Sequence, residues 1–276
     1  MWRFEGSDVA AARGLVEAAL DAGITLFDTA DIYGLDGARG FGGAEQLLGE
    51  VFAAAPDLRD RLVLASKGGI VPGVPYDSSP DYLAGALEAS LRRLGVEQLD
   101  LWQIHRPDIL THPQEIARAL EDMVRSGKVG AVGVSNFTPA QIDALASVLD
   151  IPLATTQPEF SALHRQPITD GQLDQAMRLG LTVLAWSPLG GGRLANPQSA
   201  RERATAQALD AAAAEFGVSR AAAAFSWVAS HPAHPIPIIG SQNPERIAEA
   251  ADVAKLRWTR ESWYAVLQAA MGEALP

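Results

Sequence analysis

The sequence predicts an α/β protein whose parallel sheet closes into a (β/α)8 barrel, and three observations support this fold class. Short apolar strands alternate with amphipathic helices along most of the chain, which is the order that builds a parallel sheet. The strands are continuously apolar, which indicates burial on both faces. Polar residues end many of these strands, and the Gly-x-Gly-x-x-Gly pattern of an open nucleotide-binding sheet does not occur. Both facts favour a closed barrel.

Each element is placed by its hydrophobic period and its boundary residues. Strands are expected over 24–28, 62–67, 99–105, 130–134, 153–157, 181–186 and 236–239. Helices are expected over 7–22, 43–55, 80–94, 113–127, 138–149, 170–179, 201–216, 218–230 and 243–254, with an extra helix at the C-terminus. Three helices should begin where a capping hydroxyl stands just before a proline: Ser79-Pro80, Thr111-His112-Pro113 and Thr138-Pro139.

Seven strands leave an eight-stranded barrel one strand short. The chain opens almost directly on a helix, so the first strand is expected to be short or missing. We expect residues 1–6 to be the stub of that strand, with further residues upstream in the complete native protein. No linker or long repeat interrupts the β/α alternation, so one barrel domain is expected over residues 1–276.

Composition excludes several function classes. The net charge of −11 argues against a nucleic-acid partner and disfavours an anionic membrane surface. The 276 residues contain no cysteine, so disulfides and thiolate metal sites are excluded and a reducing cytoplasm fits. No apolar run reaches the roughly 18 residues of a membrane span. His231 and His234 are separated by proline, so no metal site is expected there or elsewhere.

Four residues carry the chemistry that the sequence predicts. Asp28, Lys67 and His105 each close an apolar strand, and Tyr33 follows Asp28 in a turn. An ionisable group at the end of a buried strand is costly unless it has a task. Together the four suit proton transfer to a carbonyl that is being reduced. The tyrosine hydroxyl would donate the proton, and the lysine would lower its pKa.

Each of the four also has a structural alternative. Asp28 can cap a turn, Asp28 and Lys67 can form a purely structural ion pair, Tyr33 can be a loop aromatic, and His105 can be a core histidine. Their joint occurrence at strand ends favours the catalytic interpretation.

The chain resembles the aldo-keto reductases. The matching segments are FDTADIYG at 27–34, ASK at 65–67, LWQIHRPD at 101–108, GVSNF at 133–137, WSPLG at 186–190 and IIGS at 238–241. The resemblance implies that Tyr33 is the general acid, that Lys67 and Asp28 tune it, and that His105 orients the carbonyl. The run LGGGRL at 189–194 is most similar to a bacterial oxidoreductase branch.

The resemblance also implies a nicotinamide nucleotide, NADPH or, as a further possibility, NADH. Ser135, Asn136 and Gln157 stand where the family holds the carboxamide, and Trp186 where an aromatic stacks on the ring, although a core aromatic is the alternative. The other residues assigned to the nucleotide by resemblance are Ser187, Leu189, Gly191, Arg193, Gly240, Ser241, Asn243 and Arg246.

The phosphate-binding part of this assignment has a chemical basis. The glycines at 190–192 would let backbone amides approach a pyrophosphate, with an ordinary flexible loop as the alternative. Ser241 would contact a phosphate, and Arg246 would bind the adenosine 2′-phosphate. Many family members carry lysine in place of Gly240 and asparagine in place of Ala250, so a preference for NADPH rests mainly on Arg246.

Three functions are consistent with these residues. The first is an NADPH-dependent reductase of small aldehydes or ketones. The second is a nucleotide-binding regulatory subunit with little turnover, like the potassium-channel beta subunits that share this fold. The third is a barrel pseudoenzyme, if the first strand is missing. The loop 35–43 is longer than the compact family pattern and borders Tyr33, so it is expected to reshape the mouth of the site.

Overall fold

The computed structural model describes residues 3–4 and 6–275, and the chain divides into two compact units, Met1–Gln157 and Pro158–Pro276. The expectation of a single barrel domain over residues 1–276 stays a prediction. Of the expected strand stub at 1–6, residues 1, 2 and 5 lie outside the described part of the chain. Arg3, Phe4 and Gly6 are described and are not in a strand.

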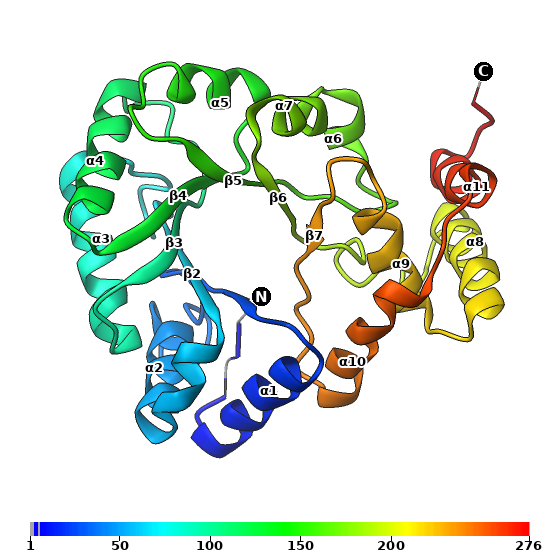
Figure 1. Cartoon of the computed structure of the whole chain (residues 1–276), viewed down its shortest axis with the longest axis horizontal. Helices are drawn as coiled ribbons and strands as arrows, with labels where there is room; N and C mark the ends of the chain where they lie inside the picture. Colours follow the sequence, from blue (N-terminus) through cyan, green and yellow to red (C-terminus); the bar gives the residue numbers. More distant parts are fainter. Residues whose placement is uncertain (1–2, 5, 276) are drawn as a thin grey trace. The chain divides into compact units, whose positions relative to one another are not determined.

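The first unit is a curved parallel sheet with helices along one side (Figure 1). Its strands are β1 (Leu26–Asp28), β2 (Val63–Gly68), β3 (Leu99–Ile104), β4 (Val129–Ser135) and β5 (Leu153–Gln157). The intervening helices are α1 (Val9–Asp21), α2 (Gly43–Ala54), the 3-10 helix η1 (Pro56–Arg61), α3 (Pro80–Leu94), α4 (Pro113–Arg125) and α5 (Pro139–Ala146). The parallel alternation confirms the predicted α/β class.

Two of the three predicted caps are confirmed and one differs. The Ser79 hydroxyl accepts from the Tyr82 amide at the start of α3, and Thr138 caps α5 in the same way. At α4 the capping residue is His112, whose Nδ1 accepts from the amide two residues on at 3.2 Å. The Thr111 hydroxyl, expected to cap, donates instead to Asp108 at 2.6 Å. Thr111 stands one residue before the capping position, because α4 begins at Pro113 and His112 directly precedes it.

The register of the sheet aligns the polar strand ends of the first unit. Lys67 of β2 lies opposite Gln103 of β3, and Ser135 of β4 lies opposite Gln157 of β5. Because parallel strands end at one edge of a sheet, these side chains gather there. The sequence prediction of polar residues at strand ends therefore becomes one polar cluster in the first unit.

The second unit contains two parallel strands, β6 (Thr182–Ala185) and β7 (Ile236–Pro237), with Leu184 opposite Ile236. Its helices are α6 (Gln166–Thr169), α7 (Gln172–Leu179), α8 (Ala200–Phe216), α9 (Arg220–Ala229), α10 (Pro244–Ala248), the 3-10 helix η2 (Glu249–Lys255) and α11 (Arg260–Met271). α11, the expected extra C-terminal helix, packs beside α8 (Figure 1).

Stacked tryptophans hold the second unit together. The rings of Trp227 and Trp263 lie 4.6 Å apart and nearly parallel, and each indole N–H donates to the other residue's carbonyl at 3.1 Å. Both polar N–H groups are thereby satisfied inside an apolar contact.

Several elements differ from expectation. The helix expected over 243–254 is split into α10 and η2. No side chain of η2 is buried, so little tertiary packing supports a continuous α-helix there. β7 is shorter than the expected strand 236–239, and the short helices α6 and η1 were not expected. No helix among residues 3–4 and 6–275 is long and apolar enough to cross a membrane.

Candidate active site

A buried ion pair lies at the centre of the polar cluster in the first unit. The Lys67 ammonium donates to the Asp28 carboxylate at 2.6 Å and to the Thr29 carbonyl at 2.7 Å. Both charged side chains are almost completely inaccessible to solvent, with 0% and 1% exposed. Burial of a charge is costly unless it is paired, and the 2.6 Å contact between Lys67 and Asp28 supplies that pairing.

Two amide side chains complete the coordination of Asp28. Its second oxygen accepts from Gln157 at 2.9 Å and from Gln103 at 3.2 Å. The Gln103 carbonyl oxygen in turn accepts from the Thr155 hydroxyl at 3.0 Å. All four side chains are buried. The network therefore satisfies the carboxylate on both oxygens and holds it in one orientation.

Tyr33 and His105 lie against this ion pair. The Lys67 nitrogen is 5.2 Å from the centre of the Tyr33 ring, and the Tyr33 and His105 rings meet edge to face at 5.5 Å. The guanidinium of Arg3 lies over the same tyrosine ring, 4.1 Å from its centre. Tyr33 and His105 are only 6% and 7% exposed. All four residues predicted to carry the chemistry are thus brought together.

The electrostatics of this cluster keep His105 uncharged. Burial, reinforced by the positive charges of Lys67, Arg106 and Arg3, lowers the pKa of His105 well below its usual 6.5. The Nδ1 atom of the ring is buried and makes no hydrogen bond to any described residue. A neutral imidazole with a free ring nitrogen can orient a polar ligand without giving up a full proton.

The residues expected at the carboxamide form a second group at the same sheet edge. The Ser135 hydroxyl donates to the Gln157 carbonyl at 3.0 Å, and the Asn136 side chain donates to Ser135 and to the His105 carbonyl. Gln157 therefore has two tasks, because its side chain also donates to Asp28. Asn136 has a positive φ of 61°, a conformation that asparagine tolerates better than most residues.

In the second unit, Trp186 directly follows β6. It pairs with Glu159, and its amide donates to the Pro158 carbonyl at 3.0 Å. The next residue, Ser187, has φ 51°. Only three non-glycine residues of the described chain have positive φ, namely Asn136, Ser187 and His234. Strained backbone of this kind clusters at ligand sites, and two of the three were predicted to bind the nucleotide.

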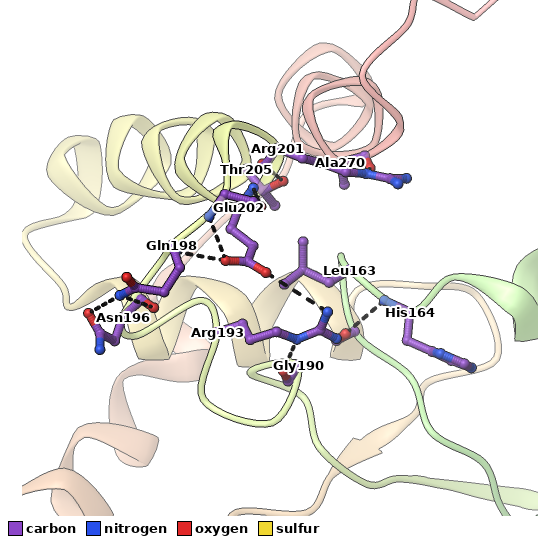
Figure 2. A network of polar contacts seen from close by, with 12 residues as sticks. Leu163, His164, Gly190, Arg193, Asn196, Gln198, Arg201, Glu202, Thr205 and Ala270 are labelled. Atoms are coloured by element: carbon purple, nitrogen blue, oxygen red, sulfur yellow. Dashed lines mark hydrogen bonds and ion pairs between the residues drawn. The ribbon is translucent and has the colours of Figure 1, made fainter.

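The glycine loop after Ser187 is held by contacts of its own. Gly190, Gly191 and Gly192 all have positive φ, so only glycine fits this loop without strain. The Arg193 side chain donates to the Gly190 carbonyl at 2.7 Å and approaches Glu202 at 4.0 Å (Figure 2). Leu189 is half-buried and precedes the loop.

Glu202 links the glycine loop to the start of α8. Its carboxylate accepts from the Gln198 amide at 2.7 Å and from the Ser199 amide at 3.0 Å (Figure 2). The bond from the Ser199 amide, together with the Glu202 amide donating to the Ser199 hydroxyl at 3.1 Å, forms the capping box of α8. The shape of the loop is thus tied to a regular helix start.

The second predicted nucleotide segment follows β7. Asn243 caps α10 by accepting from the Arg246 and Glu245 amides, and its own amide donates to the Ser241 hydroxyl at 3.2 Å. Gly240 and Arg246 are exposed. No hydrogen bond or ion pair to a described residue holds the Arg246 guanidinium, so this cation is available to an anion.

Sequence reasoning missed two members of the site, Gln103 and Thr155. Both are buried and belong to the hydrogen-bond chain that ends on Asp28. A signal for Gln103 existed. It is two residues before His105 in an apolar strand, and residues two apart share a face. Thr155 gave no such signal, because threonine is common in strands.

Comparison with known proteins places this site in a class. The sequence model described as "Aldo/keto reductase family" matches residues 1–270. The chain is 62% identical over 278 residues to a 6-dehydroglucose reductase of Novosphingobium aromaticivorans, covering 100% of this chain and 91% of that protein. It is 39% identical to a 6-dehydroglucose reductase of Agrobacterium fabrum, with 99% and 93% covered. It is 38% identical to the oxidoreductase YdhF of Escherichia coli, with 100% and 93% covered.

The parallel β/α alternation is consistent with the (β/α)8 fold, and the relatives named here are reductases and an oxidoreductase. The chain belongs to the aldo-keto reductase family, whose members use nicotinamide nucleotides. Each unit by itself offers features that fit such a nucleotide. In the first unit these are the positive-φ backbone at Asn136 and the unpartnered Nδ1 of His105. In the second unit these are the positive-φ backbone at Ser187 and the Arg246 guanidinium, which has no partner among the described residues.

Proposed function

We propose that the chain is an NADPH-dependent reductase that converts the carbonyl of an aldehyde or ketone to an alcohol, with Tyr33 as the proton donor. The observation that carries the proposal is the buried position of Tyr33 against both Lys67 and His105, at 5.2 Å and 5.5 Å. Both distances are measured to the Tyr33 ring, and an ammonium near that ring stabilises the phenolate that proton donation leaves behind.

The proposed roles follow from the contacts. A nicotinamide nucleotide, when bound, would supply the hydride to the carbonyl carbon. The Tyr33 hydroxyl donates a proton to the carbonyl oxygen, and the Lys67 ammonium stabilises the phenolate that remains. Asp28 holds that ammonium in place through the 2.6 Å contact. Neutral His105 donates a hydrogen bond to the carbonyl oxygen and shares its developing charge.

The preference for NADPH rests on Arg246. The Arg246 guanidinium makes no hydrogen bond or ion pair with a described residue, so it can give two N–H groups to a phosphate. Gly240 offers no side chain to help it. The 2′-phosphate is the group that distinguishes NADPH from NADH, so we assign Arg246 to it.

For the substrate we propose 6-dehydroglucose as the first candidate. Relatives at 62% and 39% identity carry the name 6-dehydroglucose reductase, and both are matched over 99% or more of this chain. The proposed chemistry requires only a carbonyl that can reach Tyr33 and His105.

The test is consumption of NADPH and of NADH by the purified chain, with 6-dehydroglucose, other sugar aldehydes, simple aldehydes and ketones. We expect turnover with NADPH, fastest with 6-dehydroglucose, and none in Tyr33→Phe. Product analysis should show the matching alcohol. Tight nucleotide binding without turnover on any carbonyl would contradict the proposal and favour a regulatory subunit.

A further inference from the structure

A third buried carboxyl lies beside the proposed site and has no role in the chemistry described so far. Asp31 stands in the turn between β1 and α2, two residues before Tyr33, and is 1% exposed. Its amide donates to the Lys67 carbonyl at 3.0 Å. The turn that carries the proton donor is therefore fastened to the strand that carries the lysine through Asp31.

The other two buried carboxylates near it each have a cation. Asp28 is paired with Lys67 at 2.6 Å. Glu45 of α2 is paired with Arg93 of α3 at 2.6 Å, and it also accepts a short hydrogen bond from the Ser66 hydroxyl. Among the described residues, no basic side chain forms an ion pair with Asp31, and its two nearest cations are engaged with other carboxylates.

Asp31 itself is poorly satisfied. Its Oδ1 is buried and makes no hydrogen bond to any described residue, and its Oδ2 lies 3.5 Å from the Tyr82 hydroxyl, the outer limit of a hydrogen bond. The carboxyl is also packed tightly. A Cβ added at Gly68 would lie 3.2 Å from that Oδ2 and 2.7 Å from the Trp102 ring. A carboxylate in such a place loses hydration without gaining partners.

The charged and titratable groups around Asp31 come from three elements, and their balance favours the neutral acid. Glu45 of α2, Arg93 and Tyr82 of α3, and Lys67 of β2 face it. Burial, reinforced by the negative charge of Glu45, raises the pKa of Asp31 to about 8. The positive charges of Arg93 and Lys67 oppose that shift but do not reverse it.

We propose that Asp31 is a positioning residue that holds a proton so that the full field of Lys67 acts on Tyr33. The electrostatic interaction between Asp31 and Lys67 is mutual. When Asp31 is neutral, the ammonium faces one anion, Asp28, and stabilises the phenolate. When Asp31 ionises, a second anion cancels part of that field, and the phenolate left by proton transfer is less stabilised. This inference rests on the proposed role of Tyr33.

The first experiment is the pH profile of kcat/KM for carbonyl reduction in wild type, Asp31→Asn and Asp100→Asn. Asparagine keeps the shape of the acid and cannot ionise. We expect wild-type kcat/KM to fall above about pH 8, where Asp31 titrates, and the fall in Asp31→Asn to begin at least one pH unit higher. Asp100→Asn makes the same chemical change at an ion pair with Arg59 in the same sheet and should keep the wild-type profile.

The second experiment needs no activity. A carboxyl whose pKa is higher in the folded state than in the unfolded state loses its contribution to stability as pH rises towards the folded value. The urea midpoint of Asp31→Asn, measured relative to that of wild type, should therefore rise from pH 5 to pH 9. The corresponding difference for Asp100→Asn should not change with pH. Asp31→Ser, which also lacks the acid, serves if Asp31→Asn does not fold.

The outcomes separate the two proposals. Equal pH dependence of the midpoint in wild type and both Asp31 variants would overturn the proton-holding role. A midpoint that moves as expected with an unchanged rate profile would overturn the coupling to Tyr33. If no variant reduces any carbonyl but the midpoint behaves as expected, the proposed function fails while the protonation of Asp31 stands.

Discussion

The two units of the chain prepare their predicted site residues in opposite ways. In the first unit, Asp28, Tyr33, Lys67 and His105 are buried, and the ion pair at their centre is held by several hydrogen bonds. In the second unit, Gly191, Arg193, Gly240 and Arg246 are exposed. Their segments are shaped by backbone conformation and by helix caps.

The difference follows from what each region has to do. A proton donor needs a shifted pKa, and burial beside a fixed charge is the means of shifting it. A phosphate-binding segment needs open donors that a large anion can reach, so its groups lie on loops at the surface. Substitutions should therefore affect chemistry and stability in the first unit, and nucleotide affinity in the second.

The largest effect is expected from Tyr33→Phe. Removal of the hydroxyl removes the proton donor, and general acid catalysis contributes about 10²- to 10⁴-fold. We expect kcat to fall by at least a hundredfold while the Kd for NADPH, measured by fluorescence, changes less than threefold. Turnover within threefold of wild type would contradict the expectation that substitutions in the first unit affect the chemistry.

The next largest effect is expected on stability from Lys67→Met. The change leaves Asp28 buried without its cation, and loss of one partner of a buried pair costs about 3–5 kcal/mol. Urea unfolding measures the loss. Arg193→Ala is the matched change in the second unit, where the pair with Glu202 is 4.0 Å long and the Arg193 side chain is 52% exposed. Because solvent screens such a pair, its loss should lower stability much less.

Equal losses of unfolding free energy in these two variants would mean that burial does not make the Lys67–Asp28 pair more important for stability than the Arg193–Glu202 pair. A second control is Lys67→Met combined with Asp28→Leu. Because the double variant buries no unpaired charge, it should recover part of the lost stability.

Much of the fold was predictable because its signals are local. Strand and helix positions followed from apolar period and proline caps, and the structure confirms them within a few residues in the first unit. The short helices α6 and η1 carry too few residues to show a period. The split of 243–254 depends on the absence of buried packing at η2, which a sequence pattern does not reveal.

The site was predictable only in part, for a different reason. Lys67 and His105 stand out because an ionisable residue ends an apolar strand. Gln103 contacts Asp28 only because the sheet register sets it opposite Lys67, and register is a property of the folded sheet. Asp31 looks like an ordinary turn residue in the sequence. Its burial depends on α2 and α3, which supply Glu45 and Arg93.

A smaller effect, on affinity alone, is expected from Arg246→Ala. The guanidinium has no partner among the described residues, so its removal should leave the fold intact. A charge-assisted hydrogen bond contributes about 1.5–3 kcal/mol, so the Kd for NADPH should rise about ten- to a hundredfold, while that for NADH should change little. Glu245→Ala, the neighbouring exposed position, is the control. Equal losses for both nucleotides would show that Arg246 does not contact the 2′-phosphate.

The smallest effect expected is a pH dependence of stability that His105 carries in the first unit. Its pKa is lowered in the folded state, chiefly by burial, and the unfolded value is near 6.5. The unfolded chain therefore binds a proton first as pH falls, so the free energy of unfolding should decrease below about pH 6.5, by at most about 1.4 kcal/mol per pH unit for one proton.

His231 of the second unit is only half-buried, and burial lowers its pKa as well. The urea midpoint of the wild type should fall as the pH is lowered from 7 to 5. This pH dependence should weaken more in His105→Gln than in His231→Gln. A larger loss of pH dependence in His231→Gln would mean that folding lowers the pKa of His231 more than that of His105. The assignment of His105 as a neutral hydrogen-bond donor would then have to be withdrawn.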